Sequence, residues 1–548
     1  MKSTNNKRVF KPAVATLLLQ CAAVSSGWAM EVETGNPELK LRWDNTVKYN
    51  AAFRVKDRAP GLVADANMDD GDRNFNKGLI SNRVDLLSEI DLSHKDSGLR
   101  ISGAAWYDAV YNRANDHDSP STASQSSVPY NRFTRSTRDL HGRKAELLDA
   151  FVYTRGDIGG MQASARLGRH TVLYGESLFF GDNGIAGGQA PFDVIKLLSV
   201  PGTQFKELLM PVNQLSGQLQ VLPNVTLGGY YQFEWRANRI PGSGSYFSGG
   251  DHVGPGAERF FAPGSFAHVH FDREADMRPR DGGQGGLQLR FRPESEIAEF
   301  GLYATRYHDK DFNLYLKPAA IPALPSIGSY QLVYGEDIKA FGASASTTLA
   351  GANVGFELVT RRNVPLVSDP QVAFVADNAG NPAYAVGNSL HANISAIYVL
   401  NGSPLWDGGA ILAEVAWNRR LSVSRNPGAL DRNSTRDASA VRALFIPEYY
   451  QVSPGVDLAV TAGVGYTISG RSSTNVKFAG GAEHGGDMSL GASLDFRKQF
   501  KLSVNLVHFY GGAGTFISSN TAPAATILNY KQTNKDRDFI SVSLQSTF

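Results

Sequence analysis

Residues 39–55 read LKLRWDNTVKYNAAFRV, and apolar and polar side chains alternate along almost the whole segment. The odd positions carry Leu, Trp, Val, Tyr and Phe, whereas most even positions carry Lys, Arg, Asp, Thr or Asn. Successive side chains of a β-strand point to opposite faces, so this strand has one apolar face and one polar face. Its length is about three times the ~5–6 residues of a usual globular strand, which is unusual for a soluble β-protein.

The same alternation continues to the C-terminus. It recurs over residues 225–236, 456–467 and 487–497. In the last segment Ile540, Val542 and Leu544 alternate with serine and glutamine residues. We therefore expect outward-facing side chains at odd positions of the first strand and at even positions of the last.

The connections between these strands fall into two length classes. Short turns are predicted at residues 94–98, 156–160, 223–224, 293–296, 350–353, 401–408, 453–455 and 498–500. Long polar segments lie between the resulting hairpins, among them residues 112–144, 171–211, 237–283, 309–335 and 511–537. One strand at each end of the chain and eight hairpins between them predict about 18 strands, with short periplasmic turns and long extracellular loops, as in bacterial outer-membrane barrels.

A soluble multidomain β-protein is the competing fold class. Its strands would also alternate, but they would be shorter and its loops would not be sorted by length. Beyond the N-terminal region no apolar run reaches the ~18 residues of a membrane helix, which excludes a helical membrane protein. Strands in hydrocarbon can satisfy their backbone groups only by closing into a barrel. Outward aromatic residues also lie toward strand ends, as expected of interfacial girdles: Trp43, Phe53, Trp235, Trp417, Phe496 and Tyr510.

Residues 1–29 have the pattern of a secretory signal peptide. A basic region precedes an apolar stretch at residues 13–24, and the small residues Gly27 and Ala29 precede the cleavage point. The only cysteine of the chain, Cys21, lies within this segment. We therefore expect a signal peptide at 1–29 and an outer-membrane β-barrel at 30–548, located in the outer membrane of a Gram-negative bacterium.

The mature chain is nearly neutral and free of thiols. Residues 1–29 contain four basic residues and no acidic one, so their removal changes the formal net charge from +2 to −2. This charge excludes a strongly basic nucleic-acid binder. The absence of cysteine after residue 29 excludes a disulfide scaffold.

The chain ends on an aromatic residue, Phe548, after an alternating strand. A terminal strand of this kind resembles the signal that the barrel-assembly machinery reads. Ser546 departs from the usual apolar residue or tyrosine two positions before the end. The expected partners of the chain are thus this machinery and outer-membrane lipid.

Several short motifs resemble a proteobacterial family of outer-membrane proteins catalogued as domain-of-unknown-function family 1302. They are Asp69-Asp70-Gly71-Asp72-Arg73-Asn74-Phe75, Ser81-Asn82-Arg83, Glu146-Leu147-Leu148-Asp149-Ala150-Phe151, Leu167-Gly168-Arg169-His170, Tyr174-Gly175-Glu176-Ser177, Val200-Pro201-Gly202, Lys206-Glu207-Leu208-Leu209-Met210-Pro211 and Tyr334-Gly335-Glu336-Asp337. Glycine and arginine before the third long loop are also similar to substrate-specific porins. The resemblance implies an outer-membrane location and the handling of small hydrophobic solutes, beside an inner-membrane transport system.

The polar face of the strands is expected to line a lumen. The charged residues predicted on this wall are Arg83, Asp85, Glu89, Asp91, Arg100, Arg166, Glu234, Arg236, Arg290, Arg292, Glu357, Arg361, Glu414 and Arg420. Opposite charges on neighbouring strands can pair and stiffen the wall. Alternatively, the charges form a ladder that guides polar or anionic solutes through the barrel.

The long segment 171–211 is the candidate constriction loop. It contains more apolar residues than a free surface loop normally exposes, and residues 192–198 and 204–210 are each predicted to form a short helix. Folded into the barrel, it would narrow the lumen; the alternative is an extracellular lid. The residues predicted to line the solute path are Glu176, Phe179, Phe180, Asp182, Phe192, Asp193 and Lys196.

Other chemistry has little support in the sequence. His268, His270 and Asp272 alternate as metal ligands on a strand can, but a solvated pair of loop histidines is the simpler interpretation, so no metal or other cofactor is predicted. His170, His391 and His508 lack a recognisable nucleophile setting, so no enzyme is predicted.

The leading functional interpretation is a passive outer-membrane channel for small hydrophobic or amphipathic molecules. The alternative is a structural or adhesin-like barrel whose long loops bind a partner. A channel requires a continuous lumen past the third long loop, whereas an adhesin would tolerate a sealed one.

Overall fold

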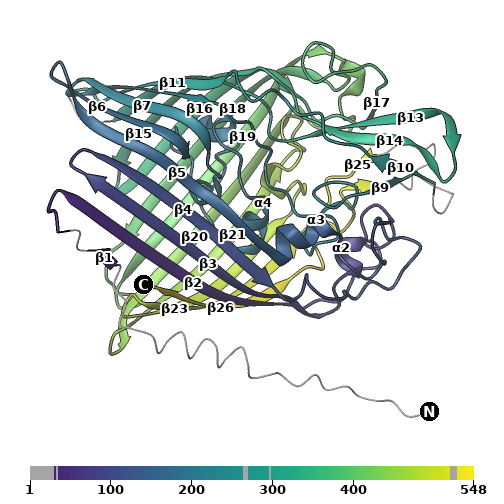
Figure 1. Ribbon diagram of the computed structural model, residues 1–548, viewed down its shortest axis with the longest axis horizontal. Coiled ribbons are helices and arrows are strands. Elements are labelled where there is room, and N and C mark those ends of the chain that lie inside the picture. The colour runs from purple at the N-terminus through teal and green to yellow at the C-terminus, as the bar shows by residue number, and fades with distance from the viewer. Residues whose placement is uncertain (1–29, 33–34, 263–268, 295–297, 519–526) are drawn as a thin grey trace.

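Long antiparallel strands close into one barrel in the computed structural model, which describes residues 30–32, 35–262, 269–294, 298–518 and 527–548 (Figure 1). The predicted signal peptide, residues 1–29, and His268 lie outside the described residues. Within the described ranges, 18 strands pair in sequence order around the barrel. The last, β26 (Phe539–Thr547), closes the ring by pairing with the first, β2 (Leu39–Arg54). The predicted all-β barrel and its strand number are confirmed.

The other barrel strands follow the chain order. They are β3 (Gly78–His94), β4 (Ser97–Asp108), β5 (Arg143–Ile158), β6 (Met161–His170), β7 (Val212–Leu222), β8 (Val225–Gln232), β11 (Gln284–Phe291), β12 (Glu299–Tyr307), β15 (Ile338–Leu349), β16 (Ala352–Pro365), β18 (Val386–Leu400), β19 (Gly408–Arg425), β20 (Asp437–Ser453), β21 (Val456–Ser469), β22 (Gly486–Phe496) and β23 (Phe500–Tyr510). The short strand β1 (Met30–Val32) lies beside the start of β2.

Short turns and long loops lie at opposite ends of the barrel, at the left and right of Figure 1 respectively. The predicted hairpins pair in register, as between β3 and β4, β5 and β6, and β22 and β23. The long loops contain the short helices α2 (Asp70–Arg73), α3 (Arg135–Thr137), α4 (Val194–Ser199) and α5 (Phe205–Leu208). No helix among the described residues is long and apolar enough to cross a membrane.

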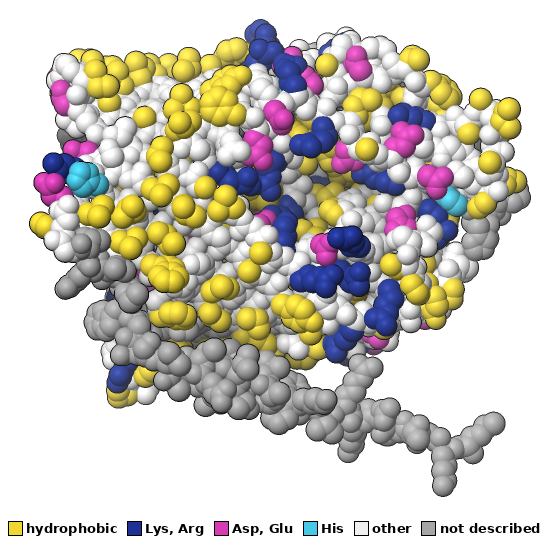
Figure 2. Space-filling model, in the orientation of Figure 1, with side chains coloured by type: hydrophobic (Ala, Val, Ile, Leu, Met, Phe, Trp, Pro, Cys, Tyr) yellow, Lys and Arg dark blue, Asp and Glu magenta, His cyan; other side chains and the backbone are white. Residues whose placement is uncertain are grey.

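The barrel exterior is apolar, as the alternation predicts. Exposed hydrophobic side chains include Phe53 on β2, Val84 and Leu86 on β3, Leu490 on β22, and Ile540, Val542 and Leu544 on β26. In Figure 2 hydrophobic side chains cover much of the part formed by strands, while most Lys and Arg side chains gather toward the loop end. The predicted phase of the first and last strands is confirmed. Such a closed antiparallel barrel with an apolar exterior is an outer-membrane protein.

The girdle expectation is wrong for Trp235. Its side chain is 2% exposed and packs against Tyr334, with ring centroids 4.9 Å apart. The strand β8 ends at Gln232, and the backbone N–H of Trp235 donates to the carboxylate of Asp281 at 3.0 Å instead of joining the barrel ladder. Trp235 therefore lies in the loop layer and not at the lipid interface.

The loops build a layer of their own over the barrel mouth. A small sheet contains β9 (Arg259–Phe261), β10 (His270–Arg273), β13 (Asn313–Ala323), β14 (Ser326–Val333) and β17 (Gln371–Val372), and a separate pair contains β24 (Ile517–Ser518) and β25 (Ile527–Leu528). Beneath it, Phe75, Tyr111, Phe133 and Tyr246 from three long loops pack with Phe539 of β26. The mouth is thus covered by packed structure.

Candidate functional site

Part of the segment 171–211, residues 176–185, is bound by two buried glutamates of the barrel strands. Glu414 of β19 accepts the backbone N–H groups of Leu178 at 3.1 Å, of Phe180 at 3.0 Å and of Phe179 between them. Glu357 of β16 accepts the backbone N–H groups of Ser177 and Ile185, both at 2.8 Å, and that of Glu176. Both glutamates are only 1% exposed. We call this segment the inner loop.

Further wall residues extend this anchorage. The guanidinium of Arg361 donates to the carbonyl oxygens of Asp182 at 2.6 Å and Gly184 at 2.8 Å. The amide of Asn183 donates to Asn393 at 2.7 Å, and its oxygen lies 3.0 Å from Nδ1 of His391. The inner loop therefore follows the wall formed by β16, β18 and β19. Its backbone groups form hydrogen bonds with side chains of that wall instead of with water.

The two helices predicted in the inner loop are present as α4 and α5. The carboxylate of Asp193 accepts the backbone N–H of Lys196 at 3.0 Å and so caps α4. The same carboxylate forms an ion pair with Arg239 at 2.9 Å, and the Lys196 ammonium donates to the carbonyl of Glu207 at 2.9 Å. Asp193 and Lys196 thus stabilise the conformation of the inner loop.

The three phenylalanines predicted to line the solute path pack mainly against protein. Phe179 is 8% exposed and packs with Leu412 and Leu444 of the wall, so it offers no surface to a solute. Phe180 packs on Phe478 with ring centroids 5.9 Å apart, and Phe192 packs on Phe205 at 5.6 Å. Their apolar area anchors the inner loop because the wall and the loop supply complementary hydrophobic side chains.

Buried charges connect the inner loop with the loop that follows β12. The Lys310 ammonium donates to the carbonyl of Gly188 at 2.9 Å. Burial raises the pKa of Asp182 to about 7, and the nearby carboxyl of Asp311 adds to this shift. Burial and Asp311 likewise raise the pKa of Asp309 to about 7, while burial lowers the pKa of Lys310 to about 8. The charges at this contact between the two loops therefore change with pH near neutrality.

Several predicted wall charges are neutralised by neighbours. Arg83 donates to Asp85 at 2.8 Å and lies over the Trp106 ring at 4.6 Å. Arg100 donates to Glu89 at 2.6 Å. The Arg100–Glu89 contact joins the neighbouring strands β4 and β3 and is the kind of pairing that stiffens a barrel wall, whereas Arg83 and Asp85 pair within β3.

Farther along the wall, Arg290 pairs with Glu299, and one of its nitrogens lies 4.0 Å from the Glu176 carboxylate of the inner loop. Glu176 is thus the inner-loop carboxylate that approaches a wall arginine.

The expected wall position of Arg236 is wrong. Because β8 ends at Gln232, Arg236 lies in the following loop, where its guanidinium donates to the carbonyl of Pro211 at 3.2 Å. Its nearest carboxylate is that of Glu234, at 4.0 Å. Arg236 holds the end of the inner loop and is not part of the strand wall.

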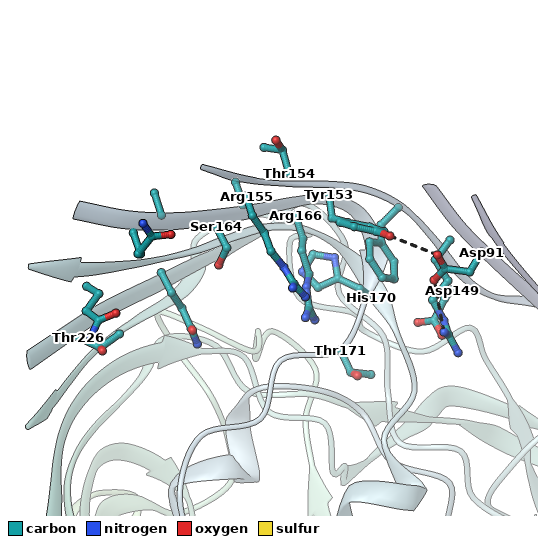
Figure 3. Close-up of a pocket in the computed structure, with 17 residues that line it drawn as sticks. Asp91, Asp149, Tyr153, Thr154, Arg155, Ser164, Arg166, His170, Thr171 and Thr226 are labelled. Atoms are coloured by element: carbon teal, nitrogen blue, oxygen red, sulfur yellow. Dashed lines mark hydrogen bonds and ion pairs between the residues drawn. The ribbon is translucent and has the colours of Figure 1, made fainter. Parts of the chain in front are cut away.

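A cavity of about 710 Å³ opens between the wall and the start of the inner loop. Its lining comes from the inward faces of β3 to β8 and includes Arg155, Arg166, Phe151, Tyr153, His170 and Thr171. Figure 3 shows the Arg155 and Arg166 side chains extending in the same direction into the cavity from the neighbouring strands β5 and β6. This volume is within the ~300–1,000 Å³ of small-molecule sites.

The arginine pair differs from the other charges of the wall. In the part of the chain that the structure describes, no carboxylate lies within ion-pair distance of Arg155 or Arg166. Arg166 lies over the ring of Phe151 at 5.7 Å, and Tyr153 donates to Asp91 at 3.2 Å on the cavity's other side. The cavity therefore presents two arginines without an ion-pair partner among the described residues, beside aromatic side chains.

The sequence interpretation named Arg166 but missed Arg155. The available signal was its position, two residues after Tyr153 on the same polar face of the strand. The anchoring role of Glu357 and Glu414 was also missed, since a strand pattern places a side chain on a face without showing which loop meets it.

Of the histidines considered for metal binding, His270 lies beside Asp272, with Nε2 3.3 Å from the carboxylate. His170 contacts the hydroxyl of Ser216 at 2.7 Å, and His391 contacts that of Ser389 at 2.8 Å. These contacts connect neighbouring wall positions.

Comparisons with known proteins place these features in context. A family model described as "Protein of unknown function (DUF1302)" matches residues 11–548. No curated protein matches the chain. Among solved structures, the chain is similar to Pseudomonas aeruginosa OccK2 (OpdF) in complex with glucuronate, with 9% identity, 93% of this chain and 98% of that chain covered and a TM-score of 0.37.

Two Acinetobacter baumannii structures are similar over comparable lengths. For OccAB3 the identity is 10%, the coverage 93% of this chain and 99% of that chain, and the TM-score 0.40. For the outer-membrane channel DcaP the identity is 8%, the coverage 95% and 99%, and the TM-score 0.36.

Proposed function

Because the chain belongs to the DUF1302 family of proteins of unknown function and forms an outer-membrane barrel with a charged interior, we propose that it is a passive channel for small amphipathic molecules. A barrel of this strand number has an interior wide enough for an aqueous path unless loops fill it. The inner loop fills part of this space, so we propose that it forms the constriction. The chain acts by selective passage and not as an enzyme.

The single observation that carries the proposal is the cavity with the Arg155 and Arg166 pair. An anionic group of a solute would bind the two guanidinium groups, which match carboxylate geometry. The hydrophobic body of the solute would then contact the half-buried Tyr153, which lines the same cavity, while Phe151 lies buried beneath Arg166. We therefore infer that the preferred solutes combine an apolar body with one negative charge.

The predicted path residues fit this proposal unequally. Glu176 approaches Arg290 from the inner loop and would set the polarity of the constriction. Asp182, Asp193 and Lys196 would act through the shape of the loop, since each is engaged by neighbouring protein groups. Solutes would contact the Arg155 and Arg166 side of the lumen.

The test is single-channel recording in planar bilayers with benzoate as the probe solute. The double variant Arg155→Ala/Arg166→Ala should reduce the anion preference measured from the reversal potential in a salt gradient, and it should weaken current block by benzoate about tenfold. Arg135→Ala removes one positive charge from an exposed loop position and should change neither quantity. A wild-type protein that conducts no current, or unchanged benzoate block in the double variant, would refute the proposal.

A surface-binding function is the second candidate, because the β13–β14 hairpin exposes apolar side chains in the loop layer. Ile321 is 88% exposed and Leu324 is 73% exposed, and Val375 in a nearby loop is 89% exposed. Exposed apolar side chains that gather on a surface often mark a binding site. If the barrel is an adhesin, Ile321→Ser/Leu324→Ser should abolish attachment of cells that display it without altering channel conductance.

A further inference from the structure

Three buried aspartates meet beneath the loop layer, away from the proposed solute path. Asp69 and Asp70 lie at the start of α2, in the loop between β2 and β3, and Asp251 lies in the loop between β8 and β11. Each of the three is 0% exposed. One oxygen from each carboxylate lies within 4.8 Å of the others. Asp69 and Asp70 belong to the motif at residues 69–75, for which the channel proposal supplies no role.

Hydrogen bonds satisfy only part of this cluster. The Asp70 carboxylate contacts Nε2 of His117 at 2.8 Å and accepts the backbone N–H and hydroxyl of Ser124 at 3.0 and 2.6 Å. By contrast, Oδ1 of Asp69 and Oδ1 of Asp251 accept no hydrogen bond from the described residues. Their second oxygens accept from Arg73 and from the backbone N–H of Asp70. Two fully buried carboxylates thus each retain an unpartnered oxygen.

The charge of the cluster is also incompletely balanced. Among the described residues no basic side chain lies within ion-pair distance of Asp251. Arg73 forms an ion pair with Asp69, and Nε2 of His117 lies 2.8 Å from the Asp70 carboxylate, so Asp251 is the member of the triad to which the described residues supply no basic neighbour. Asp72, on the same helix, is balanced: Arg537 and Arg54 form ion pairs with it at 3.0 and 2.9 Å. An unpartnered carboxylate oxygen in full burial is costly, and a bound cation would supply the partner that Oδ1 of Asp69 and Oδ1 of Asp251 lack within the described part of the chain.

We propose that Asp69, Asp70 and Asp251 bind one divalent metal cation of the calcium type. Calcium prefers oxygen ligands at about 2.4 Å, so two ligands on opposite sides of the ion lie up to about 4.8 Å apart. The spread of the three oxygens is within this limit. An all-oxygen ligand set favours calcium or magnesium over zinc or copper. Between these two, a fully buried site suits calcium, because magnesium gives up its bound water reluctantly.

The bound ion would join two long loops. It would bridge the loop between β2 and β3 to the loop between β8 and β11, while His117 and Ser124 hold the central aspartate from the loop between β4 and β5. The 69–75 motif would then act as a metal-binding segment that assembles the loop layer over the barrel mouth. This role is independent of which solute the channel carries.

A second carboxylate cluster provides the matched control. His308, Glu336 and Asp337 also bring three ligand atoms within 4.8 Å of one another. There, however, Arg280 pairs with Glu336, and Arg306 pairs with Asp337 at 2.8 Å. Because arginines already balance these carboxylates, this cluster has no need of a cation.

The experiment uses the full mature barrel in detergent, freed of metals by a chelator. Calcium chloride titrated by isothermal calorimetry should bind with one ion per chain, and saturating calcium should raise the thermal unfolding temperature. Asp251→Asn and, separately, Asp69→Asn should each weaken calcium binding by more than about tenfold. Glu336→Gln should bind calcium as the wild type does.

Two results would overturn the proposal: a wild-type barrel without saturable calcium binding, or undiminished binding by Asp251→Asn. The wild-type titration shows whether the barrel binds calcium even if a variant fails to fold. A variant that fails to fold is identified by the loss of heat-modifiable mobility on a gel. Loss of conductance with intact calcium binding would count against the channel proposal alone.

Discussion

At the scale of single residues, buried glutamates perform an uncommon task in this barrel. Glu357 and Glu414 each use their carboxylate to collect several backbone N–H groups of the inner loop. An irregular segment inside a barrel lacks a strand neighbour, so its amide groups need other acceptors. The carboxylates of Glu357 and Glu414 therefore act as the hydrogen-bond acceptors that a neighbouring strand would otherwise supply.

This arrangement predicts the behaviour of Glu414→Ala. The substitution leaves three buried backbone N–H groups without an acceptor, and each costs about 1–3 kcal/mol. The inner loop should therefore leave the wall, and trypsin should cleave the folded barrel at Lys196 or Lys206 several times faster than in the wild type. Glu448→Ala removes a half-buried glutamate of the neighbouring strand β20 that, among the described residues, binds no inner-loop backbone group and serves as the control. Equal cleavage rates for the two variants would contradict the anchoring role.

The charges between the inner loop and the β12–β15 loop predict a dependence on pH. Burial raises the pKa of Asp182 and Asp309 from 3.8 to about 7, so the folded state holds protons that the unfolded state releases. Their contribution to stability is therefore complete below about pH 4 and is lost as the pH rises through about 7. Lys310, with its pKa lowered to about 8, changes charge above this window.

Hydrogen–deuterium exchange of residues 181–189, corrected for intrinsic rates, measures this effect. Protection should be greater at pH 5 than at pH 8, and Asp182→Asn/Asp309→Asn should remove most of the difference. The hydrogen bonds from Arg361 to the carbonyls of Asp182 and Gly184 should sustain the protection that persists at both pH values. Identical protection at the two pH values in the wild type would exclude the titration.

At the scale of elements, the strands were predictable and the loops were not. Alternation over residues 39–55 reveals both the existence and the orientation of β2, because the lipid face must be apolar at every outward position. The hairpins were also predictable, because each short turn in the sequence joins two alternating segments. The end of β8 could not be predicted from local sequence. The backbone N–H of Trp235 donates to Asp281, a residue distant in sequence, instead of to a neighbouring strand.

The inner loop shows the same limit for the candidate site. Its excess of apolar residues and its two helices could be predicted from composition and pattern. The orientation of Phe179 could not, since it depends on Leu412 and Leu444, more than two hundred positions away along the chain. Arg155 was overlooked because its significance lies in the absence of a nearby carboxylate, which only the assembled wall reveals.

Deletion of residues 181–189 tests the inner loop as an element. This part carries the anchors Asn183, which donates to the carbonyl of Trp417 on β19, and Ile185, whose backbone N–H donates to Glu357 on β16. Its removal should raise single-channel conductance and abolish solute preference, because the constriction widens. A shorter deletion at the exposed tip of the β13–β14 hairpin, residues 320–324, should leave conductance unchanged. Unaltered conductance after the inner deletion, in a barrel that still folds, would place the constriction elsewhere.

At the scale of the whole molecule, closure depends on the final residues. β26 pairs with both β23 and β2, and the backbone of Phe548 exchanges hydrogen bonds of 2.7 and 2.9 Å with Asn45. Strand edges left open in hydrocarbon have no solvent to satisfy them. Removal of Phe548 should therefore sharply reduce the amount of heat-modifiable barrel in outer membranes, through poorer recognition by the assembly machinery. Normal levels would show that the terminal aromatic residue is dispensable; Phe10→Ala, in the predicted signal peptide, is a control for processing.

The pairing of β2 with β26 also has a consequence for how the gene product is made. Thr46 and Thr547, whose hydroxyls lie 3.0 Å apart, are separated by 501 positions. The ring cannot close until the ribosome has finished and the entire polypeptide has been exported, so every copy must pass through the periplasm as an unclosed chain. A premature stop codon before β26 would therefore produce no smaller closed barrel, because β2 and β23 would each lack the partner that closes the ring.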